Sequence, residues 1–426
     1  MKTILTMAAA LMSGVAAMAQ TASVKVDVTN EWKDDKADAP VAVKLSDVKK
    51  LDFVVKSVRV TCKGKDVACQ LDDMDGDMLP DEVFFVTDIK GKDTKTFEVT
   101  LSAKEDKKAK AVEPRIYTAL QIRDKQDKHP DVTRVEAPGK SFLFNDIYMH
   151  GITVESELTG YRIYFDHRQN IDLYGKKLRR IELPVTQFYT SEEQLNEGYG
   201  VDVLWAGNAI GCGSFKDWKG GKPENWTEVG VRGQRIVTTG PLRSVVEVYD
   251  LGVQGIDELM AYDMCQRYSL YAGHRDLQVD VTFTPKTMGK KKSFADKEFC
   301  TGVQKVGATA DETTRKGHKS QGYVKKDGMA ASWGCDYPDM GKKHVWAPEP
   351  IGLAVYVPKE YIRDTKEDDL NYLFVLQPDK ANRLNYFVSF CADKEEKGYH
   401  TAKEWFASLD DWKDDVSHPV KVTVKN

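Results

Sequence analysis

The residues with the clearest chemical potential lie in the segment "GYRIYFDHR" of this 426-residue chain. Successive side chains of a β-strand point to opposite faces, so a strand here would place Tyr161, Ile163, Phe165 and His167 on one face. The other face would carry two cations, a phenol and a carboxylate: Arg162, Tyr164, Asp166 and Arg168. A guanidinium group can pair with the carboxylate of an acidic sugar, a phenol can transfer a proton, and an aspartate can orient the arginine. The segment therefore predicts either a cleft for an acidic sugar or a solvated strand face crossed by salt bridges.

Side chains before and after this strand extend the candidate site. His150 lies just upstream, and its imidazole titrates near neutral pH, which suits a general base, although a single histidine can equally be structural. Lys176 lies downstream in "DLYGKK" and completes the predicted catalytic residues. The predicted substrate-binding residues come from this region and from two later segments: Tyr174, Asp202, Trp205, Arg243, Tyr249 and Arg267.

Three kinds of function fit these residues. A polysaccharide lyase needs a base beside a uronate carboxylate, a cation for the developing enolate and an acid for the leaving oxygen, and the region from 150 to 177 supplies all three. A glycoside hydrolase needs two carboxylates ~5 to 9 Å apart. The carboxylates that could form such a pair are Glu155, Glu157, Asp166, Asp172 and Asp202. A glycan-binding or epimerase-like accessory protein needs only the aromatic and arginine surface. We favour the lyase, with an acidic poly- or oligosaccharide as substrate and no organic cofactor.

A second chemical pattern is the acidic stretch "DDMDGDMLPDE", which lies between two strand-like segments. Four carboxylates fall at relative positions 1, 3, 5 and 9 of a loop: Asp73, Asp75, Asp77 and Asp81. This spacing turns alternate oxygens onto one hard cation, with the carbonyl of Leu79 at position 7, and oxygen ligands favour Ca²⁺. Position 6 is Met78 where such loops normally have glycine, so a left-handed backbone would be strained there. The stretch predicts a structural calcium site, at a turn or a domain interface, or an acidic turn that caps its own backbone.

The elements that must position these residues are mostly β-strands. Apolar and polar residues alternate in "DLQVDVTFTP" and in several similar segments, as in a sheet with one buried face. Helix-like segments are few, namely "TSEEQLNEGYG" and "HTAKEWFASLDDW". The chain is therefore predicted to be all-β, with a small N-terminal β-sandwich and a large antiparallel β-sandwich. The lysine-rich stretch "SAKEDKKAKAVEPR" indicates a linker, and the expected domains span residues 20–135 and 136–426.

Composition and the N-terminus bear on partners and location. Charged residues make up 30% of the chain, but the net charge is only -4, so no basic surface for nucleic acid is indicated. Residues 1–19 have the pattern of a signal peptide, and no later apolar run approaches a membrane span. We therefore expect export without membrane insertion, and by default a periplasmic location. The seven cysteines are scattered, and Cys62 with Cys69 is the one local disulfide candidate.

Several segments resemble one family of proteins. They are "HGITVESELTGYRIYFDHRQNIDLYGKK", "YGVDVLWAGNAIGCG", "ASWGCDYP" and "EWFASLDDW". They are similar to an uncharacterised domain-of-unknown-function family of exported proteins from polysaccharide-degrading bacteria of the Bacteroides type. The resemblance implies a place in glycan degradation, with pectin-like or other uronate polymers as targets. It also implies a large β-sandwich similar to those of galactose mutarotases and several polysaccharide lyases, and it assigns no catalytic residue.

Overall fold

The computed structural model describes residues 20–106, 111–126, 128–254, 261–286, 294, 297–306, 321–336 and 349–426. The predicted signal peptide at 1–19 lies outside these residues. Within them nearly every element is a strand and all the paired strands are antiparallel, which confirms the predicted all-β sandwich fold. The helices in the described part are short: α1 Leu183–Thr186, α2 Glu192–Asn196 and α3 Ala402–Ser417.

A small domain is formed by two sheets that pack face to face. The five-stranded sheet has the order β27-β1-β7-β3-β4, and the three-stranded sheet has the order β2-β6-β5. Its core forms because one face of each strand is apolar; in β1, for example, Val24, Val26 and Val28 are buried. The strands are β1 Thr21–Thr29, β2 Lys36–Lys44, β3 Ser57–Cys62, β4 Lys65–Val67, β5 Cys69–Asp72, β6 Glu82–Ile89, β7 Thr94–Ser102 and β27 Lys421–Lys425.

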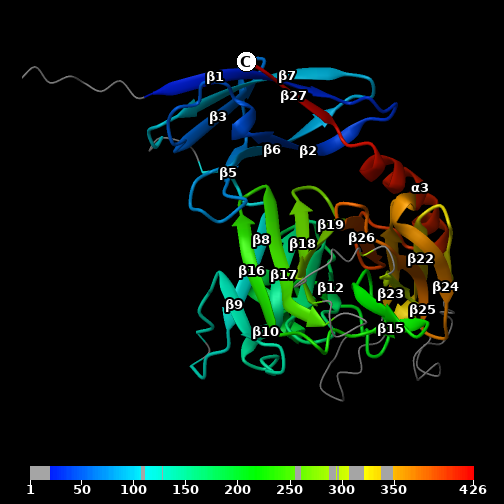
Figure 1. Cartoon of the computed structure of the whole chain (residues 1–426). Helices are drawn as coiled ribbons and strands as arrows, with labels where there is room; N and C mark the ends of the chain where they lie inside the picture. The colour runs from blue at the N-terminus through cyan, green and yellow to red at the C-terminus, as the bar shows by residue number, and fades with distance from the viewer. Residues whose placement is uncertain are drawn as a thin grey trace, which may run out of the picture.

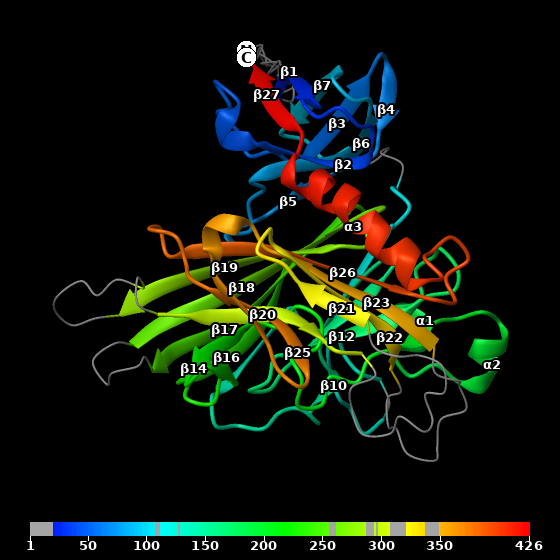
Figure 2. The same cartoon turned by 90° about the vertical axis from the view of Figure 1, so that its right-hand side faces the viewer.

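The chain returns to the small domain at its C-terminal end. Figure 1 shows β27 beside β1, and the register pairs Val26 with Val424. Helix α3 precedes β27 and lies between the two domains in both views (Figures 1 and 2). At the other boundary, β8 (Ile116–Ile122) and β9 (Arg134–Pro138) join sheets of the large domain although both begin before residue 136. The observed sheets thus differ from the expected division at residue 135, because alternation within a strand does not reveal which sheet it joins.

The large domain packs a nine-stranded sheet against two five-stranded sheets. The nine-stranded sheet has the order β21-β22-β23-β26-β19-β18-β17-β16-β9. We name the other two the β11 sheet, β13-β12-β11-β10-β8, and the β20 sheet, β15-β14-β20-β25-β24. One core joins all three, as in the stacking of Phe283 on Phe299 at 4.5 Å. In β19 the residues Leu277, Val279, Val281 and Phe283 are buried, as the alternation predicts.

The strand bounds of the large domain are as follows. The nine-stranded sheet contains β9 Arg134–Pro138, β16 Val231–Thr239, β17 Arg243–Gln254, β18 Ala261–Tyr271, β19 Leu277–Lys286, β21 Gln321–Val324, β22 Met329–Asp336, β23 Glu349–Tyr356 and β26 Arg383–Ala392. The β11 sheet contains β8 Ile116–Ile122, β10 Ile147–Ser156, β11 Gly160–Tyr164, β12 Ile171–Gly175 and β13 Val201–Asp202. The β20 sheet contains β14 Lys216–Lys219, β15 Lys222–Glu224, β20 Phe299–Gln304, β24 Ile362–Glu367 and β25 Asn371–Leu376.

The structure differs from the sequence analysis at two places, the pairing of Cys62 with Cys69 and the end of strand β11. Cys62 and Cys69 are both free thiols, since the chain turns at Lys63 and Gly64, which both have positive φ, and Cys62 faces Lys65 across the hairpin. The turn lies earlier than a disulfide would require, and Cys69 continues into the other sheet. Strand β11 ends at Tyr164, so His167 does not reach the core and is exposed on a turn.

Candidate functional site

His150 is held by an irregularity in strand β10. The pairing of β10 with β8 shifts register between Tyr148 and Thr153, and both Met149 (φ 57°) and His150 (φ 61°) have left-handed backbones. Non-glycine residues rarely adopt this conformation, and each costs roughly 1 to 3 kcal/mol. The resulting β-bulge buries Met149 and leaves His150 half-buried. Bulges of this kind often re-aim a side chain beside an active site.

The environment of His150 favours a neutral imidazole. Nδ1 lies 2.7 Å from the carbonyl oxygen of Phe144, so Nδ1–H donates to it and Nε2 keeps its lone pair. The ring stacks on the Phe144 ring at 3.9 Å. Burial lowers the pKa of His150, and the nearby Arg162 lowers it further. The arrangement therefore suits a general base at neutral pH.

A buried polar network lies next to His150 on the outer face of the β11 sheet. Arg162 on β11 is directly opposite Asp172 on β12, and its Nη2 contacts Asp172, Asp202 (3.1 Å) and the Tyr164 hydroxyl (2.9 Å). The Tyr164 hydroxyl donates to Asp172 at 2.7 Å. The guanidinium lies over the rings of Phe188 (4.4 Å) and Tyr164 (4.9 Å). Side chains of three neighbouring strands, β11, β12 and β13, thus converge on one arginine.

Burial decides the protonation states in this network. Burial, reinforced by the charge of Asp172, raises the pKa of Tyr164, so its hydroxyl keeps its proton. The same two causes raise the pKa of Asp202 well above its usual range. Tyr164 is therefore protonated and cannot act as a base, and Asp172 with Asp202 share a single cation.

Arg168 connects this network to solvent. The turn after β11 is fixed by Asp166, which accepts hydrogen bonds from the backbone N–H of Arg168 (2.8 Å) and from its Nε (2.7 Å). The guanidinium carbon of Arg168 lies 5.5 Å from the Phe144 ring centre and 5.7 Å from that of Tyr164. His150, Tyr164 and Arg168 therefore surround Phe144, and the His150 and Tyr164 ring centres are 6.3 Å apart.

The exposed aromatic side chains gather around this cluster. Among the described residues, the large aromatic side chains that are exposed are Phe142 (62%), Tyr189 (38%) and Trp205 (38%). Phe142 stacks on Phe144 at 5.9 Å, and Trp205 follows Asp202 in the chain. Exposed aromatic faces bury apolar surface well when a flat ring of a ligand covers them. The acid–base groups thus lie on segments that also carry exposed aromatic rings, and Phe142 reaches the cluster through Phe144.

A cavity of ≈ 650 Å³ adjoins Arg168 on the same side of the molecule. Its wall includes Asn170, Lys216, Asn225 and the loop beside Trp205. The Lys216 Nζ is buried and donates to Asn170 Oδ1 (2.8 Å), Asn225 Oδ1 (2.9 Å) and the Arg168 carbonyl. Burial lowers the pKa of Lys216 to about 7. The sequence analysis missed Lys216, because a lysine at the start of a strand is normally solvated and no pattern marks it as buried.

Two of the predicted residues on this side of the sheet are structural. Tyr174 is buried under Phe188 and its hydroxyl donates to the Gly200 carbonyl at 2.7 Å. Lys176 is buried, pairs with Glu155 at 2.5 Å and donates to the Ser156 carbonyl. Glu155 also accepts from the backbone of Leu183 at 3.0 Å, so the pair anchors α1. Neither side chain is placed to reach a substrate.

Three predicted substrate-binding residues lie on another sheet. Arg243, Tyr249 and Arg267 belong to β17 and β18, on the outer face of the nine-stranded sheet. Arg243 pairs with Asp72 of the small domain, and Arg267 pairs with Glu247 at 2.7 Å. Tyr249 donates to Glu136 at 2.8 Å. They hold the domains and the sheet together, away from the cluster around His150.

The acidic loop lies at the interface of the two domains. Carboxylate oxygens of Asp73, Asp75 and Asp81 lie within 4.8 Å of one another, whereas Asp77 is not in this group. Asp73 accepts hydrogen bonds from the backbone N–H of Gly76 (2.7 Å) and of Met78 (2.7 Å), so the loop caps its own backbone. Met78 has φ 71°, the left-handed conformation that glycine would favour.

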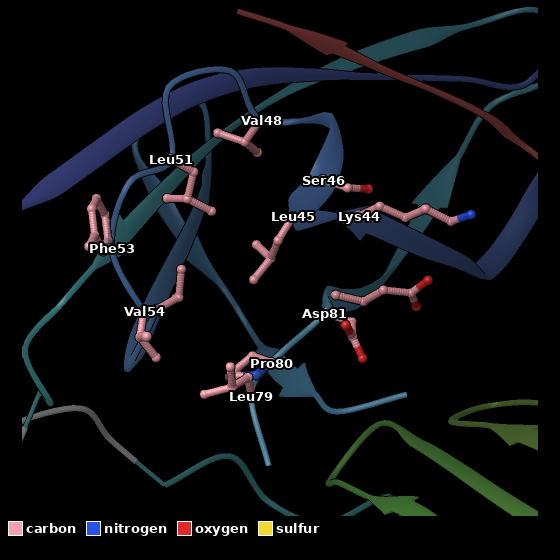
Figure 3. Close-up of a pocket in the computed structure, with 12 residues that line it drawn as sticks. Lys44, Leu45, Ser46, Val48, Leu51, Phe53, Val54, Leu79, Pro80 and Asp81 are labelled. Atoms are coloured by element: carbon pink, nitrogen blue, oxygen red, sulfur yellow. The ribbon is translucent and has the colours of Figure 1, made fainter. Parts of the chain in front are cut away.

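Contacts on both sides of the acidic loop show where it sits. The Met74 carbonyl lies 3.4 Å from Arg267 of the nine-stranded sheet. On the small-domain side, Leu79, Pro80 and Asp81 line a hollow of ≈ 580 Å³ that is otherwise largely apolar (Figure 3). In Figure 3 the apolar side chains Leu51, Phe53 and Val54 and the charged ones lie at opposite sides of this hollow. The acidic loop is thus separate from the cluster around His150.

The fold and this cluster define a two-domain, all-antiparallel β-sandwich protein with an acid–base network on one sheet face. The chain belongs to the DUF4861 family, a domain of unknown function, whose model matches residues 28–422. No curated protein sequence matches it. In the part of the chain that the structure describes, no helix has the length and apolar character to cross a bilayer.

Three solved structures are distantly similar to this chain. An alpha-mannosidase from Enterococcus faecalis is 9% identical with a TM-score of 0.43, and a glycosyl hydrolase family 38 protein from the same organism is 10% identical with a TM-score of 0.44. Both comparisons cover 95% of this chain but only 46% and 47% of those proteins, so this chain spans just under half of their length. A putative aldose 1-epimerase from Klebsiella pneumoniae is 8% identical with a TM-score of 0.31, over 70% of this chain and 95% of that one.

Proposed function

We propose that this protein acts on carbohydrate and cleaves a uronate-containing glycan by β-elimination at the cluster of His150, Tyr164 and Arg168. The observation that carries the proposal is the bulge that presents His150 as a neutral base. It lies beside a protonated phenol and a half-exposed arginine, and the exposed ring of Phe142 lies nearby on Phe144. These are the base, the acid and the cation that elimination needs.

The proposed reaction assigns one step to each group. Nε2 of His150 accepts the proton from the carbon next to the uronate carboxylate, while Arg168 pairs with that carboxylate as it gains charge. The electron pair of the broken C–H bond forms a C=C double bond, and the bond from the neighbouring carbon to the glycosidic oxygen breaks. Tyr164 then gives the leaving oxygen the hydroxyl proton that it shares with Asp172 before substrate binds, and the hydrogen bond from Arg162 Nη2 stabilises the phenolate that forms.

The carboxylates of the site favour elimination over hydrolysis. Asp172 and Asp202 are buried and both contact the same Nη2 of Arg162. A glycosidase holds two carboxyl groups ~5 to 9.5 Å apart, and both must reach the sugar from opposite sides of the bond that breaks. The side chains of Asp172 and Asp202 are only 5% and 8% exposed and are committed to the same guanidinium, so neither is placed to reach a sugar. Glu155 is committed to Lys176, and Glu157 to Arg115.

The test is the ultraviolet absorbance of the unsaturated product. We expect the full chain to produce this absorbance with polygalacturonate, alginate or glucuronan. His150→Ala should lower kcat about 10²- to 10⁴-fold, and Tyr164→Phe should lower it as well, because each removes a proton-transfer group. His400→Ala, at an exposed histidine on the loop before α3, is the matched control and should keep full activity. New reducing ends without the absorbance would instead indicate hydrolysis and refute elimination.

A further inference from the structure

Arg123 follows strand β8, which forms one edge of the β11 sheet. Its backbone N–H donates to the Asp146 carbonyl at 2.9 Å or less, and its side-chain Nε donates to the Asn145 carbonyl at 2.8 Å. The carbonyl of Phe144, the residue before Asn145, accepts the hydrogen bond from His150. Neighbouring carbonyl groups of one segment therefore hold both His150 and Arg123.

The terminal nitrogens of the Arg123 side chain are open to a ligand. The side chain is exposed, and within the described residues it makes no ion pair and its Nη1 and Nη2 have no hydrogen-bond acceptor. The other described arginines without an ion pair are Arg363 on β24 and Arg383 on β26. A carboxylate is the partner that matches a guanidinium best, because two parallel hydrogen bonds can form.

The carboxylates near Arg123 in the chain are not its partners. Asp124 accepts a hydrogen bond from a backbone N–H at 3.1 Å, and Asp131 accepts one from a glutamine amide at 3.0 Å. The Asp146 side chain is exposed, and it is the backbone carbonyl of Asp146 that bonds to Arg123. An acidic ligand at Arg123 therefore displaces no carboxylate of the described chain.

Aromatic rings connect Arg123 to the candidate site. Its guanidinium carbon lies 5.4 Å from the centre of the Tyr148 ring. The Tyr148 hydroxyl donates to Gln187 Oε1 at 2.8 Å, and the Tyr148 ring meets the Tyr189 ring edge-on at 6.1 Å. Tyr148 also packs on the apolar cluster that contains Phe188, the ring beneath the buried polar network. Arg123 and the exposed Tyr189 therefore lie on the same face of the β11 sheet as that network.

Arg123 is also close to the proposed base. Burial has the largest effect in lowering the pKa of His150, and the positive charges of Arg162 and Arg123 lower it further. His150 thus lies near two exposed or half-exposed guanidinium groups, those of Arg123 and Arg168. A polyuronate carries one carboxylate on every sugar ring, so two such arginines beside one base suit the carboxylates of two sugars.

We propose that Arg123 and Tyr189 form a second uronate subsite, which binds a sugar other than the one that is cleaved. The inference rests on the proposed function, since it takes a polymer of acidic sugars as the substrate. The terminal nitrogens of Arg123 bind the carboxylate of the second sugar, and the exposed ring of Tyr189 covers an apolar sugar face. The site therefore favours blocks of consecutive uronates over single uronates between neutral sugars.

The test is isothermal titration calorimetry of the full chain with hexasaccharides of galacturonate, mannuronate and glucuronate. His150→Ala is present in every preparation so that the sugar is not cleaved. We expect at least one hexasaccharide to bind, and Arg123→Gln to weaken this binding about three- to tenfold, because the charge-assisted hydrogen bonds are lost. Arg363→Gln is the matched control, since it removes another exposed arginine without an ion pair, and should leave the binding unchanged.

Two further measurements separate a carboxylate subsite from a general effect of charge. The fully methyl-esterified form of the same hexasaccharide should bind equally well with and without Arg123→Gln, because its carboxylates are masked. Arg123→Lys keeps the charge but loses the paired geometry, so it should recover only part of the affinity.

Four results would overturn the inference: no acidic hexasaccharide binds, Arg123→Gln leaves the affinity and the melting temperature unchanged, Arg363→Gln weakens binding equally, or the ester loses as much affinity as the acid. The unsaturated product is measured separately, on chains that keep His150. Product formation without any effect of Arg123→Gln on binding refutes the subsite alone. Binding that depends on Arg123 without any product refutes the elimination alone.

Discussion

At the scale of single residues, the β11 strand was predictable and its surroundings were not. Period-two alternation correctly placed Tyr161 and Ile163 on the core face of the sheet and Arg162 and Tyr164 on its other face, although Arg162 is buried as well. The left-handed bulge at His150 has little sequence signal: histidine adopts positive φ more often than most residues, but Met149 does not, and nothing marks the two together as a bulge. The burial of Lys216 was equally hidden, since its partners Asn170 and Asn225 come from separate turns.

The acidic loop gives a prediction at this scale. We expect millimolar Ca²⁺ to raise the melting temperature of the full chain, because a ligand that binds only the folded state stabilises it. Asp75→Asn should abolish the increase, whereas Asp77→Asn should largely keep it, since Asp77 lies outside the group of converging carboxylates. Differential scanning fluorimetry with and without a chelator measures both. An equal melting temperature in chelator and calcium would show that the loop only caps its own backbone.

At the scale of elements, strand type was predictable but strand partnership was not. The amphipathic pattern predicts that β8 and β27 are strands, yet nothing in either segment says that β8 joins the large domain or that β27 joins the small one. The same limit explains why the sequence analysis grouped Arg243, Tyr249 and Arg267 with the candidate substrate-binding residues. Their alternation indicates an outward face, but that face belongs to the nine-stranded sheet and is partly covered by the small domain.

Strand β27 gives the prediction at this scale. Val424 packs against the small-domain core, whereas Thr423 on the same strand faces solvent. Val424→Asp should lower the free energy of unfolding by about 1 to 3 kcal/mol, because it places a charge against apolar side chains. Thr423→Asp is the matched control and should change stability by less than about 0.5 kcal/mol. Urea unfolding measures both, and equal effects of the two variants would mean that β27 adds little to the domain.

At the scale of the whole molecule, polar contacts join the two domains, and one of them involves a histidine that titrates. His274, on the turn between β18 and β19, has Nε2 3.0 Å from the Asp38 carbonyl of the small domain and Nδ1 3.4 Å from Asp276. Burial alone would lower the pKa of His274, but Asp276, the Asp38 carbonyl and Asp415 outweigh it and raise the pKa to about 9. A charged imidazole is thus favoured at the junction.

The raised pKa predicts how stability depends on pH. The folded state holds the proton more tightly than the unfolded state, whose histidine has the ordinary value of 6.5. The contribution of His274 is therefore complete below that value and is lost as pH rises through about 9. We expect the melting temperature to fall over this range, and to fall less in His274→Gln. The exposed His400→Gln is the control; an unchanged slope in His274→Gln would exclude His274 as the cause.

The return of the chain to its first domain also sets an order of folding. Strand β1 is made early, but its neighbour β27 follows the whole large domain in sequence. Until synthesis reaches residue 425, the edge of β1 that β27 will cover has unpaired N–H and C=O groups, and the apolar side chains beneath β27 remain open. The small domain therefore closes only after the large one has been synthesised, so a chain interrupted inside the large domain keeps an exposed sheet edge that chaperones and proteases can recognise.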